Sequence, residues 1–185
     1  MKFFLLFASL LILSSCKING TLQGLVSNYK KTKNENPNLL VKPSDSSTVC
    51  MSLTQNNNSV LIINGKQLKQ CLSENKKALL YIWEPKCKSK FCYDLNTLQK
   101  RCDEAGFELY IIAEYYDSPL MEKKYELKRP ILGIDTKYYH SNMTAKYTSR
   151  FFSDLMAEEE MSDKRLIYFE KGFFVKSVAL FDELL

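Results

Sequence analysis

The chain lacks several features that would place it in common functional classes. Its longest apolar run, residues 3–13, is interrupted by one serine and is well short of the roughly 20 residues that a transmembrane helix needs. Its 26 Lys and Arg residues exceed its 21 Asp and Glu residues only modestly and form no long basic stripe, which argues against a nucleic-acid partner. It has no internal repeat, and its one histidine, His140, stands in a tyrosine-rich segment typical of a loop rather than of a metal site.

The start of the chain has the pattern of an export signal. Lys2 supplies a positive charge, the apolar run follows, and Leu13-Ser14-Ser15 places small residues directly before Cys16. This pattern resembles the signal peptide of bacterial lipoproteins. The resemblance implies that residues 1–15 are removed and that Cys16 is acylated. The mature chain is then expected outside the cytoplasm, in the cell envelope, anchored by its lipid to a membrane.

Composition divides the rest of the chain into two parts. Residues 16–47 are rich in Lys, Asn, Ser and Thr and have little apolar periodicity, so they are predicted to form a polar tether. Short apolar spots such as residues 39–41 are expected to be able to dock on the domain. Residues 48–185 have the pattern of one globular domain. A chain of this length can bury a core without the help of disulfides, so the pattern leaves the role of the cysteines open.

The apolar periodicity of residues 48–185 predicts an α/β fold. Predicted strands cover residues 49–53, 60–63, 78–83, 107–113, 130–134, 166–169 and 173–180, and predicted helices cover residues 66–77, 95–105, 119–127 and 144–156. The first two strands are expected to form one hairpin, and the last two a C-terminal hairpin that turns at Lys171-Gly172. Strands that alternate with crossover helices pair in parallel. We therefore expect a three-layer sandwich around a central mixed sheet.

Three segments together resemble the thioredoxin-like superfamily over about residues 60–182. They are the buried strand ending in Tyr81-Ile82-Trp83, the pair Cys87 and Cys92 opening a helix, and the final hairpin. The resemblance implies a thioredoxin-like fold and a thiol-disulfide oxidoreductase that acts on protein thiols or disulfides and needs no cofactor. The chain departs from the superfamily in separating its cysteines by four residues instead of two, and in having Lys164 where a cis-proline is expected.

The residues around the cysteine pair point to the same chemistry. A thiolate is the nucleophile in disulfide exchange, and its pKa falls at a helix N-terminus or beside cations. Cys87 is expected in a strand-to-helix turn among Lys86, Lys88 and Lys90, so it is predicted to be the attacking thiolate and Cys92 the resolving thiol.

The spacing of the pair limits the local structure. Five residues along a regular helix correspond to a rise of about 7.5 Å and a rotation of about 140°, beyond the usual reach of a disulfide. If the two cysteines bond, either Cys87 lies in the loop before the helix or the first helical turn unwinds. The alternative to a catalytic pair is a fixed structural disulfide or two inert thiols.

The remaining cysteines have a weaker case for redox chemistry. Cys71 and Cys102 lie on apolar helical faces and are expected to fill the core. Cys50 could pair with Cys71 or serve as a partner thiol. Once Cys16 is acylated an odd number of cysteines remains, so at least one thiol is left unpaired or bonds to another molecule.

Three other functions compete with thiol-disulfide exchange. The first is a non-catalytic thioredoxin-fold binding or scaffold lipoprotein. The second is a copper chaperone similar to the Sco type, which combines two cysteines with a distal histidine, here His140, but spaces its cysteines differently. The third is a peroxiredoxin, which requires a threonine three residues before the reactive cysteine, where this chain has Glu84. No resident metal or cofactor is predicted.

Overall fold

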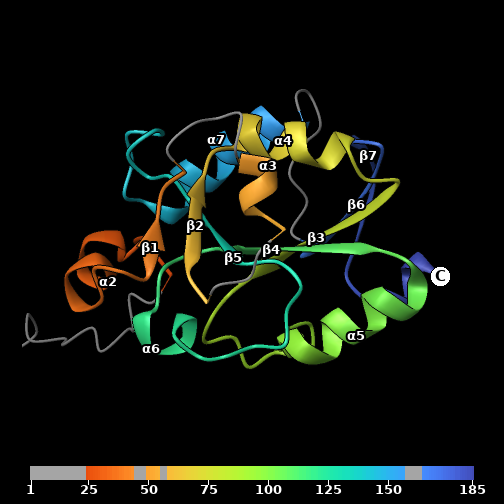
Figure 1. Cartoon of the computed structure of the whole chain (residues 1–185), viewed down its shortest axis with the longest axis horizontal. Coiled ribbons are helices and arrows are strands. Elements are labelled where there is room, and N and C mark those ends of the chain that lie inside the picture. The colour runs from red at the N-terminus through yellow and green to blue at the C-terminus, as the bar shows by residue number, and fades with distance from the viewer. Residues whose placement is uncertain (1–23, 44–48, 55–57, 157–163) are drawn as a thin grey trace, which may run out of the picture.

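In the computed structural model, which describes residues 24–43, 49–54, 58–156 and 164–185, a seven-stranded sheet forms the centre of the chain (Figure 1). The strands are β1 (Leu40–Val41), β2 (Val60–Ile63), β3 (Lys77–Trp83), β4 (Glu108–Ala113), β5 (Ile131–Ile134), β6 (Leu166–Glu170) and β7 (Phe173–Val178). The helices are α2 (Tyr29–Glu35), α3 (Val49–Ser52), α4 (Gly65–Ser73), α5 (Leu95–Ala105), α6 (Ser118–Met121), α7 (Thr144–Met156) and the 3₁₀ helix η2 (Phe181–Leu184).

The sheet is mixed, in the order β1-β2-β5-β4-β3-β6-β7. Neighbouring strands pair in parallel from β1 through β2, β5 and β4 to β3. Strand β6 is antiparallel to β3, and β7 is antiparallel to β6. Every residue of β3 after Lys77 is buried, as expected for a strand covered on both faces. The α/β prediction with a central mixed sheet and a C-terminal hairpin turning at Lys171-Gly172 is confirmed.

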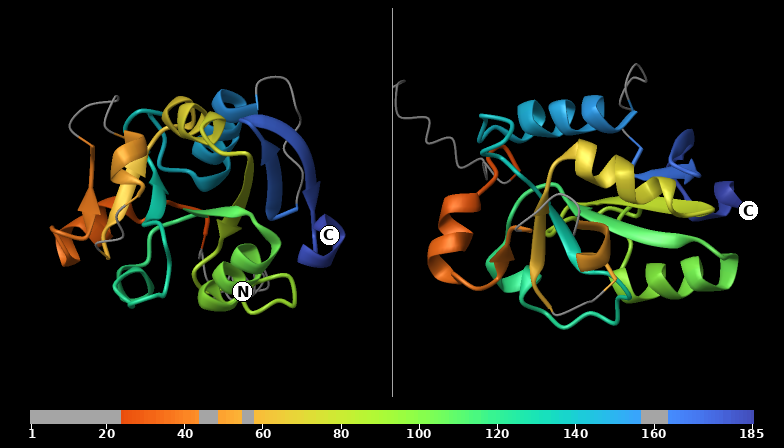
Figure 2. Two further views of the ribbon diagram at one scale, coloured as in Figure 1. Left: turned by 45° about the vertical axis from the view of Figure 1, so that its right-hand side comes forward. Right: turned by 45° about the horizontal axis from the view of Figure 1, so that its top comes forward.

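Helices cover both faces of this sheet (Figures 1 and 2). On one face α3, α4 and α7 contribute buried apolar side chains such as Val49, Leu72 and Phe151 to one core cluster. On the other face α5 and η2 contribute Leu98 and Phe181 to a second cluster. The sheet therefore lies between two helical layers, each with its own core.

Local sequence explains where α4 begins and how closely it packs against α7. The Asn64 side chain accepts from the backbone N–H of Gln67, and the Gln67 side chain accepts from the backbone N–H of Asn64, so a capping box starts α4. Gly65 then lies against α7, where an added Cβ would be 2.3 Å from the Phe151 carbonyl oxygen. Only glycine allows this approach of the two helices.

The predicted strand at residues 49–53 is wrong. Residues Val49–Ser52 form the short helix α3, and β2 pairs with β1 and β5 instead of forming a hairpin. Val49 and Leu53 are both fully buried while Met51 is 73% exposed, so the apolar period is four residues and not two.

The predicted polar tether is also wrong for residues 24–43. They contain α2 and β1, with Leu39 and Leu40 buried and the backbone N–H of Val60 donating to the Leu39 carbonyl at 2.8 Å. The expected docking of residues 39–41 on the domain is confirmed, because Leu39 and Leu40 are buried and Leu40–Val41 forms β1 at the edge of the sheet. Residues 16–23 and 44–47 of the predicted tether lie outside the described residues. None of the helices in the described ranges combines the length and apolarity of a membrane span.

The predicted helix at residues 119–127 is shorter than expected. It covers Ser118–Met121 and is capped by the side chain of Asp117. The chain then leaves the helix because the Tyr125 ring packs edge-on against Trp83, with ring centroids 6.0 Å apart, and the backbone N–H of Glu126 donates to the Asn96 side chain at 2.8 Å. Tertiary contacts with β3 and α5 thus override the local helical pattern.

Candidate active site

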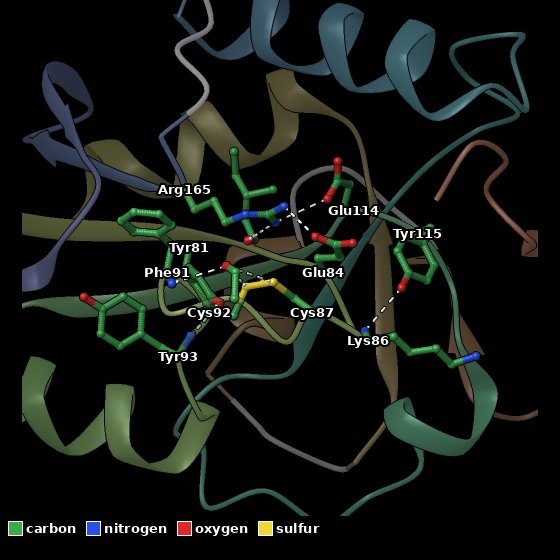
Figure 3. Close-up of a disulfide and its surroundings, with 12 residues drawn as sticks. Tyr81, Glu84, Lys86, Cys87, Phe91, Cys92, Tyr93, Glu114, Tyr115 and Arg165 are labelled. Atoms are coloured by element: carbon green, nitrogen blue, oxygen red, sulfur yellow. Dashed lines mark hydrogen bonds and ion pairs between the residues drawn. A yellow bond between two sulfur atoms is a disulfide. The ribbon is translucent and has the colours of Figure 1, made fainter. Parts of the chain in front are cut away.

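Cys87 and Cys92 form a disulfide in the loop that connects β3 to α5 (Figure 3). Their Cα atoms are 6.1 Å apart, and both residues are partly exposed. The loop follows the carboxyl end of a central strand, which is where ligands and reactive groups gather in parallel α/β sheets. The two residues proposed to react are therefore bonded to each other and reachable from solvent.

The cysteines precede α5 and do not open it, which corrects the sequence-based expectation. The helix begins at Leu95, and the Asp94 side chain accepts from the backbone N–H of Thr97 at 2.9 Å. Of the two alternatives for a bonded pair, Cys87 in the loop before the helix is the one found. The Asp94 carboxylate already occupies the N-terminus of α5, so the helix dipole does not act directly on Cys87.

Two buried tyrosines hold the ends of this loop (Figure 3). The backbone N–H of Lys86 donates to Tyr115 Oη at 3.2 Å, and that of Tyr93 donates to Tyr81 Oη at 2.9 Å. Burial raises the pKa of Tyr81, so its hydroxyl stays protonated. The segment 87–92 can therefore change conformation while its ends stay fixed. Sequence reasoning missed both tyrosines, although a buried tyrosine at a strand end signals a hydroxyl that needs a partner.

The Ser89 hydroxyl lies next to the disulfide, within reach of both sulfur atoms. Its Oγ is 3.5 Å from Cys87 Sγ and 3.3 Å from Cys92 Sγ, and it accepts from the backbone N–H of Phe91 at 3.3 Å. A disulfide sulfur carries no proton, so the hydroxyl is the donor in these contacts. The same hydroxyl can donate to whichever sulfur becomes a thiolate when the bond opens.

The three lysines near the pair are not equivalent. Lys86 Nζ is 2.7 Å from the buried carboxylate of Asp117, and its side chain extends away from the disulfide (Figure 3). The hydrogen bond and the charge of Asp117 raise the pKa of Lys86. Lys88 and Lys90 form no ion pair within the described residues, and Lys90 lies over the Phe91 ring at 5.2 Å. Lys88 and Lys90 are thus the lysines of the described loop without an ion pair, and Lys123 lines the hollow that contains the two sulfurs.

An ion-paired arginine joins the strand ends next to the loop (Figure 3). Arg165 Nη2 is 2.6 Å from Glu84 Oε2, and its Nη1 is 3.3 Å from Glu114 Oε2. The Arg165 backbone carbonyl also accepts from the N–H of Ile82 at 2.9 Å. Burial raises the pKa of Glu114, the nearby charge of Glu84 adds to this, and Arg165 opposes it. The cluster fixes the ends of β3 and β4 and the start of β6 relative to one another.

The disulfide loop separates two shallow hollows. One, of about 260 Å³, is lined by both cysteines together with Trp83, Leu120 and Tyr125. The other, of about 250 Å³, is lined by Ser89, Phe91, Lys164, Arg165 and Ala179. Lys164 and Arg165 thus share a hollow with Ser89 and Phe91 of the cysteine loop, but not with Cys87. The first hollow leaves open space beside the two sulfurs.

The other cysteines have different roles. Cys50 and Cys71 form a second disulfide, with Cα atoms 5.2 Å apart, that ties α3 to α4, so Cys71 is a bonded core residue and not a free one. Cys102 is the free cysteine of the described ranges, fully buried in α5, and burial raises its pKa to about 12. The predicted core role of Cys102 is confirmed. Cys16 lies outside the described residues.

His140 lies away from the cysteine pair. It lines a hollow next to α2, together with Thr136 and Lys137, and not the hollow that contains the sulfurs. Within the described residues, no group of three or more His, Cys, Asp or Glu side chains is arranged to hold a metal ion. The geometry gives no support to a copper site built from Cys87, Cys92 and His140.

The loop as a whole presents a partly exposed disulfide, a hydroxyl near both sulfurs and two lysines that form no ion pair within the described residues. A thiolate from solvent can attack such a disulfide, because access to the sulfurs governs the rate of exchange. Comparisons with known proteins give no match to a family model, a curated protein or a solved structure.

Proposed function

We propose that the protein is a membrane-tethered lipoprotein of thioredoxin-like fold that exchanges disulfides with extracytoplasmic proteins through Cys87 and Cys92. The observation that carries this proposal is the position of their disulfide, partly exposed in a loop whose ends are held by other bonds. The Cys50–Cys71 disulfide, by contrast, connects two helices; Cys71 is 2% exposed, and Cys50, although partly exposed, packs against the same core. The first disulfide has both cysteines partly exposed, and the second has one of them in the core.

The exchange proceeds in two steps when the pair is reduced. The Cys87 thiolate attacks a partner disulfide, forming a mixed disulfide and releasing one partner sulfur as a thiolate. The Cys92 thiolate then attacks Cys87 Sγ, which releases the second partner sulfur and leaves the Cys87–Cys92 disulfide. Two electrons pass from the cysteine pair to the partner, and the reverse sequence oxidises a partner dithiol. Ser89 donates to the thiolate that each step creates near it.

The topology supports the thioredoxin-like part of the proposal. The unit β3–α5–β4 is parallel, and the hairpin β6–β7 adds to it with β6 antiparallel to β3. This arrangement puts the cysteine loop between a central strand and the helix that follows it. The strands β1, β2 and β5 extend the sheet on the other side.

The lipoprotein part rests on residues 1–16, where charge, apolar run and small residues precede Cys16. Cys16→Ala is expected to abolish both acylation and processing, because the cysteine accepts the acyl chains. Labelling cells with a radioactive fatty acid measures this directly. Unchanged incorporation in the variant would remove the lipid anchor from the proposal.

Trapping of the mixed disulfide tests the redox function. Cys92→Ser is expected to accumulate a covalent complex with a partner protein, since no thiol remains to resolve it, and Cys87→Ser is expected to trap none. The double variant Cys50→Ala/Cys71→Ala serves as the matched control and is expected to capture nothing. If neither single variant captures a partner, the enzyme is excluded and a binding or scaffold lipoprotein remains.

A further inference from the structure

A basic and apolar surface lies where the N-terminal segment joins the domain. It consists of Leu25, Val26, Lys30, Lys31, Lys137, Tyr138 and Met143, and is called the N-terminal surface below. Two backbone hydrogen bonds unite its halves, from Ser27 N–H to the Asn142 carbonyl at 2.9 Å and from Thr144 N–H to the Leu25 carbonyl at 3.0 Å. A bridge between Val26 and Met143 adds to them. The surface therefore belongs to the fold and is at the α2 end of the molecule (Figure 1).

Its apolar side chains are more exposed than a stable core residue would be. Leu25 is 59% exposed, Met143 53% and Tyr138 42%. Leu25 and Met143 lie on the segments 25–27 and 142–144, which pair with each other, and Tyr138 lies in the turn that precedes the second segment. Clustered exposed apolar side chains mark a surface that binds something.

Cations surround this patch. Lys30, Lys31 and Lys137 line a hollow of about 490 Å³ beside it. Glu35 forms a long ion pair with Lys31, at 3.8 Å, and Asp135 is buried and bonded to Lys42 at 2.6 Å. Positive charge thus dominates the accessible part of the surface. An apolar patch with a basic border fits the interface of an anionic bilayer, where the apolar groups enter the headgroup region and lysines meet phosphates.

We propose that the N-terminal surface binds the anionic lipid surface of the membrane that holds the protein. The proposal rests on the lipoprotein part of the proposed function. About eight residues separate Cys16 from Gly24, so the acylated end is at most about 28 Å from the start of the described chain. Such a short connection holds this end of the domain, and no other, close to the bilayer. The anchor gives the lipid surface a high effective concentration at this end of the domain, so even a weak contact persists.

This contact also sets the position of the disulfide. Gly24 lies against the Tyr115 ring, since a Cβ built on this glycine would be 3.6 Å from Tyr115 Cε1. Tyr115 Oη in turn accepts from the backbone N–H of Lys86. The cysteine loop is thus adjacent to the segment that leads to the anchor. Binding of the N-terminal surface keeps Cys87 and Cys92 near the bilayer, and it favours partners whose thiols lie close to the same membrane.

Vesicle binding by the mature chain with Cys16→Ser tests the contact without any acyl chain. The protein is expected to sediment with vesicles of phosphatidylcholine and phosphatidylglycerol in equal parts, less strongly at high salt, and hardly with phosphatidylcholine alone. The triple variant Lys30→Gln/Lys31→Gln/Lys137→Gln is expected to bind about a hundredfold more weakly, at about fivefold per lysine. Leu25→Ser/Met143→Ser is expected to weaken binding without changing its salt dependence.

The matched control lies on the opposite side of the molecule, near the β6–β7 turn. There Lys69, Lys171 and the 77% exposed Phe173 also combine cations with an apolar ring. Lys69→Gln/Lys171→Gln/Phe173→Ser is expected to leave vesicle binding unchanged. Failure of the Cys16→Ser chain to bind the anionic vesicles, or an equal loss in the control, would overturn the proposal. Because neither acylation nor redox chemistry enters this assay, its result is independent of the trapping and labelling experiments.

Discussion

The two disulfides are expected to differ in what their loss costs the fold. The Cys50–Cys71 bond closes a sequence separation of 21 residues, and the Cys87–Cys92 bond closes one of 5. In the chain-entropy description these separations correspond to about 3.3 and about 2 kcal/mol of stabilisation, respectively. Removal of the first bond also disturbs the core, because Cys71 is a core residue. Removal of the second bond leaves the ends of its loop hydrogen-bonded to Tyr81 and Tyr115.

Two double variants isolate these contributions. Cys50→Ala/Cys71→Ala is expected to lower the free energy of unfolding by about 3 kcal/mol, and Cys87→Ala/Cys92→Ala by about 2 kcal/mol or less. Urea unfolding measures both, and a slope of about 2 kcal/mol/M converts the first loss into a midpoint shift of about 1.5 M. The same asymmetry is expected on reduction: a limiting amount of reductant should open Cys87–Cys92 in the native protein and leave Cys50–Cys71 intact.

The opposite order would refute this reasoning. If Cys87→Ala/Cys92→Ala costs more stability than Cys50→Ala/Cys71→Ala, the loop disulfide supports the fold and cannot open and close during a catalytic cycle. Mass spectrometry after alkylation of the free thiols identifies which bond the reductant has opened. Simultaneous loss of both bonds would show that the fold does not survive reduction of the loop.

Three further predictions concern single side chains. Ser89→Ala is expected to slow reduction of Cys87–Cys92 and to raise the pKa of the thiol that leaves, as measured by alkylation rate against pH, because the hydroxyl no longer stabilises the thiolate. Burial raises the pKa of Glu114, so the native state binds its proton more tightly than the unfolded state, and stability falls as pH rises through the window above its ordinary pKa. Glu114→Gln is accordingly expected to gain stability relative to the wild type as pH rises above the ordinary pKa of a glutamate in urea unfolding, and a difference that stays constant with pH would contradict this. Cys102 is expected to resist alkylation in the native protein and to react only in urea, since burial raises its pKa to about 12.

The parts of the fold that sequence predicts well are those with strong local patterns. The apolar run that ends at Trp83 identifies β3, and helical spacing identifies α7 with bounds that the structure reproduces. The Lys171-Gly172 turn identifies the last hairpin, because both residues adopt positive φ values of 51° and 82°. In each case the signal lies within a single segment of the chain.

The parts that sequence misses depend on distant contacts. Residues 49–53 alternate like a strand, yet Val49 and Leu53 both face a core completed by other segments. The candidate site shows the same limit. Sequence identifies Cys87 and Cys92, but the Arg165 side chain that pairs with Glu84 comes from 81 residues further along the chain. Pairings over such separations have no local signature.

The reduction potential of the Cys87–Cys92 disulfide tests the central claim most directly. It is measured by equilibrating the protein in glutathione buffers of defined ratio and counting alkylated cysteines at each ratio by mass spectrometry. An exposed exchanging disulfide is expected above about −300 mV, where protein and small-molecule thiols can reduce it, with Cys50–Cys71 below that value. A Cys87–Cys92 potential as low as that of Cys50–Cys71 would show two structural disulfides and contradict a redox function.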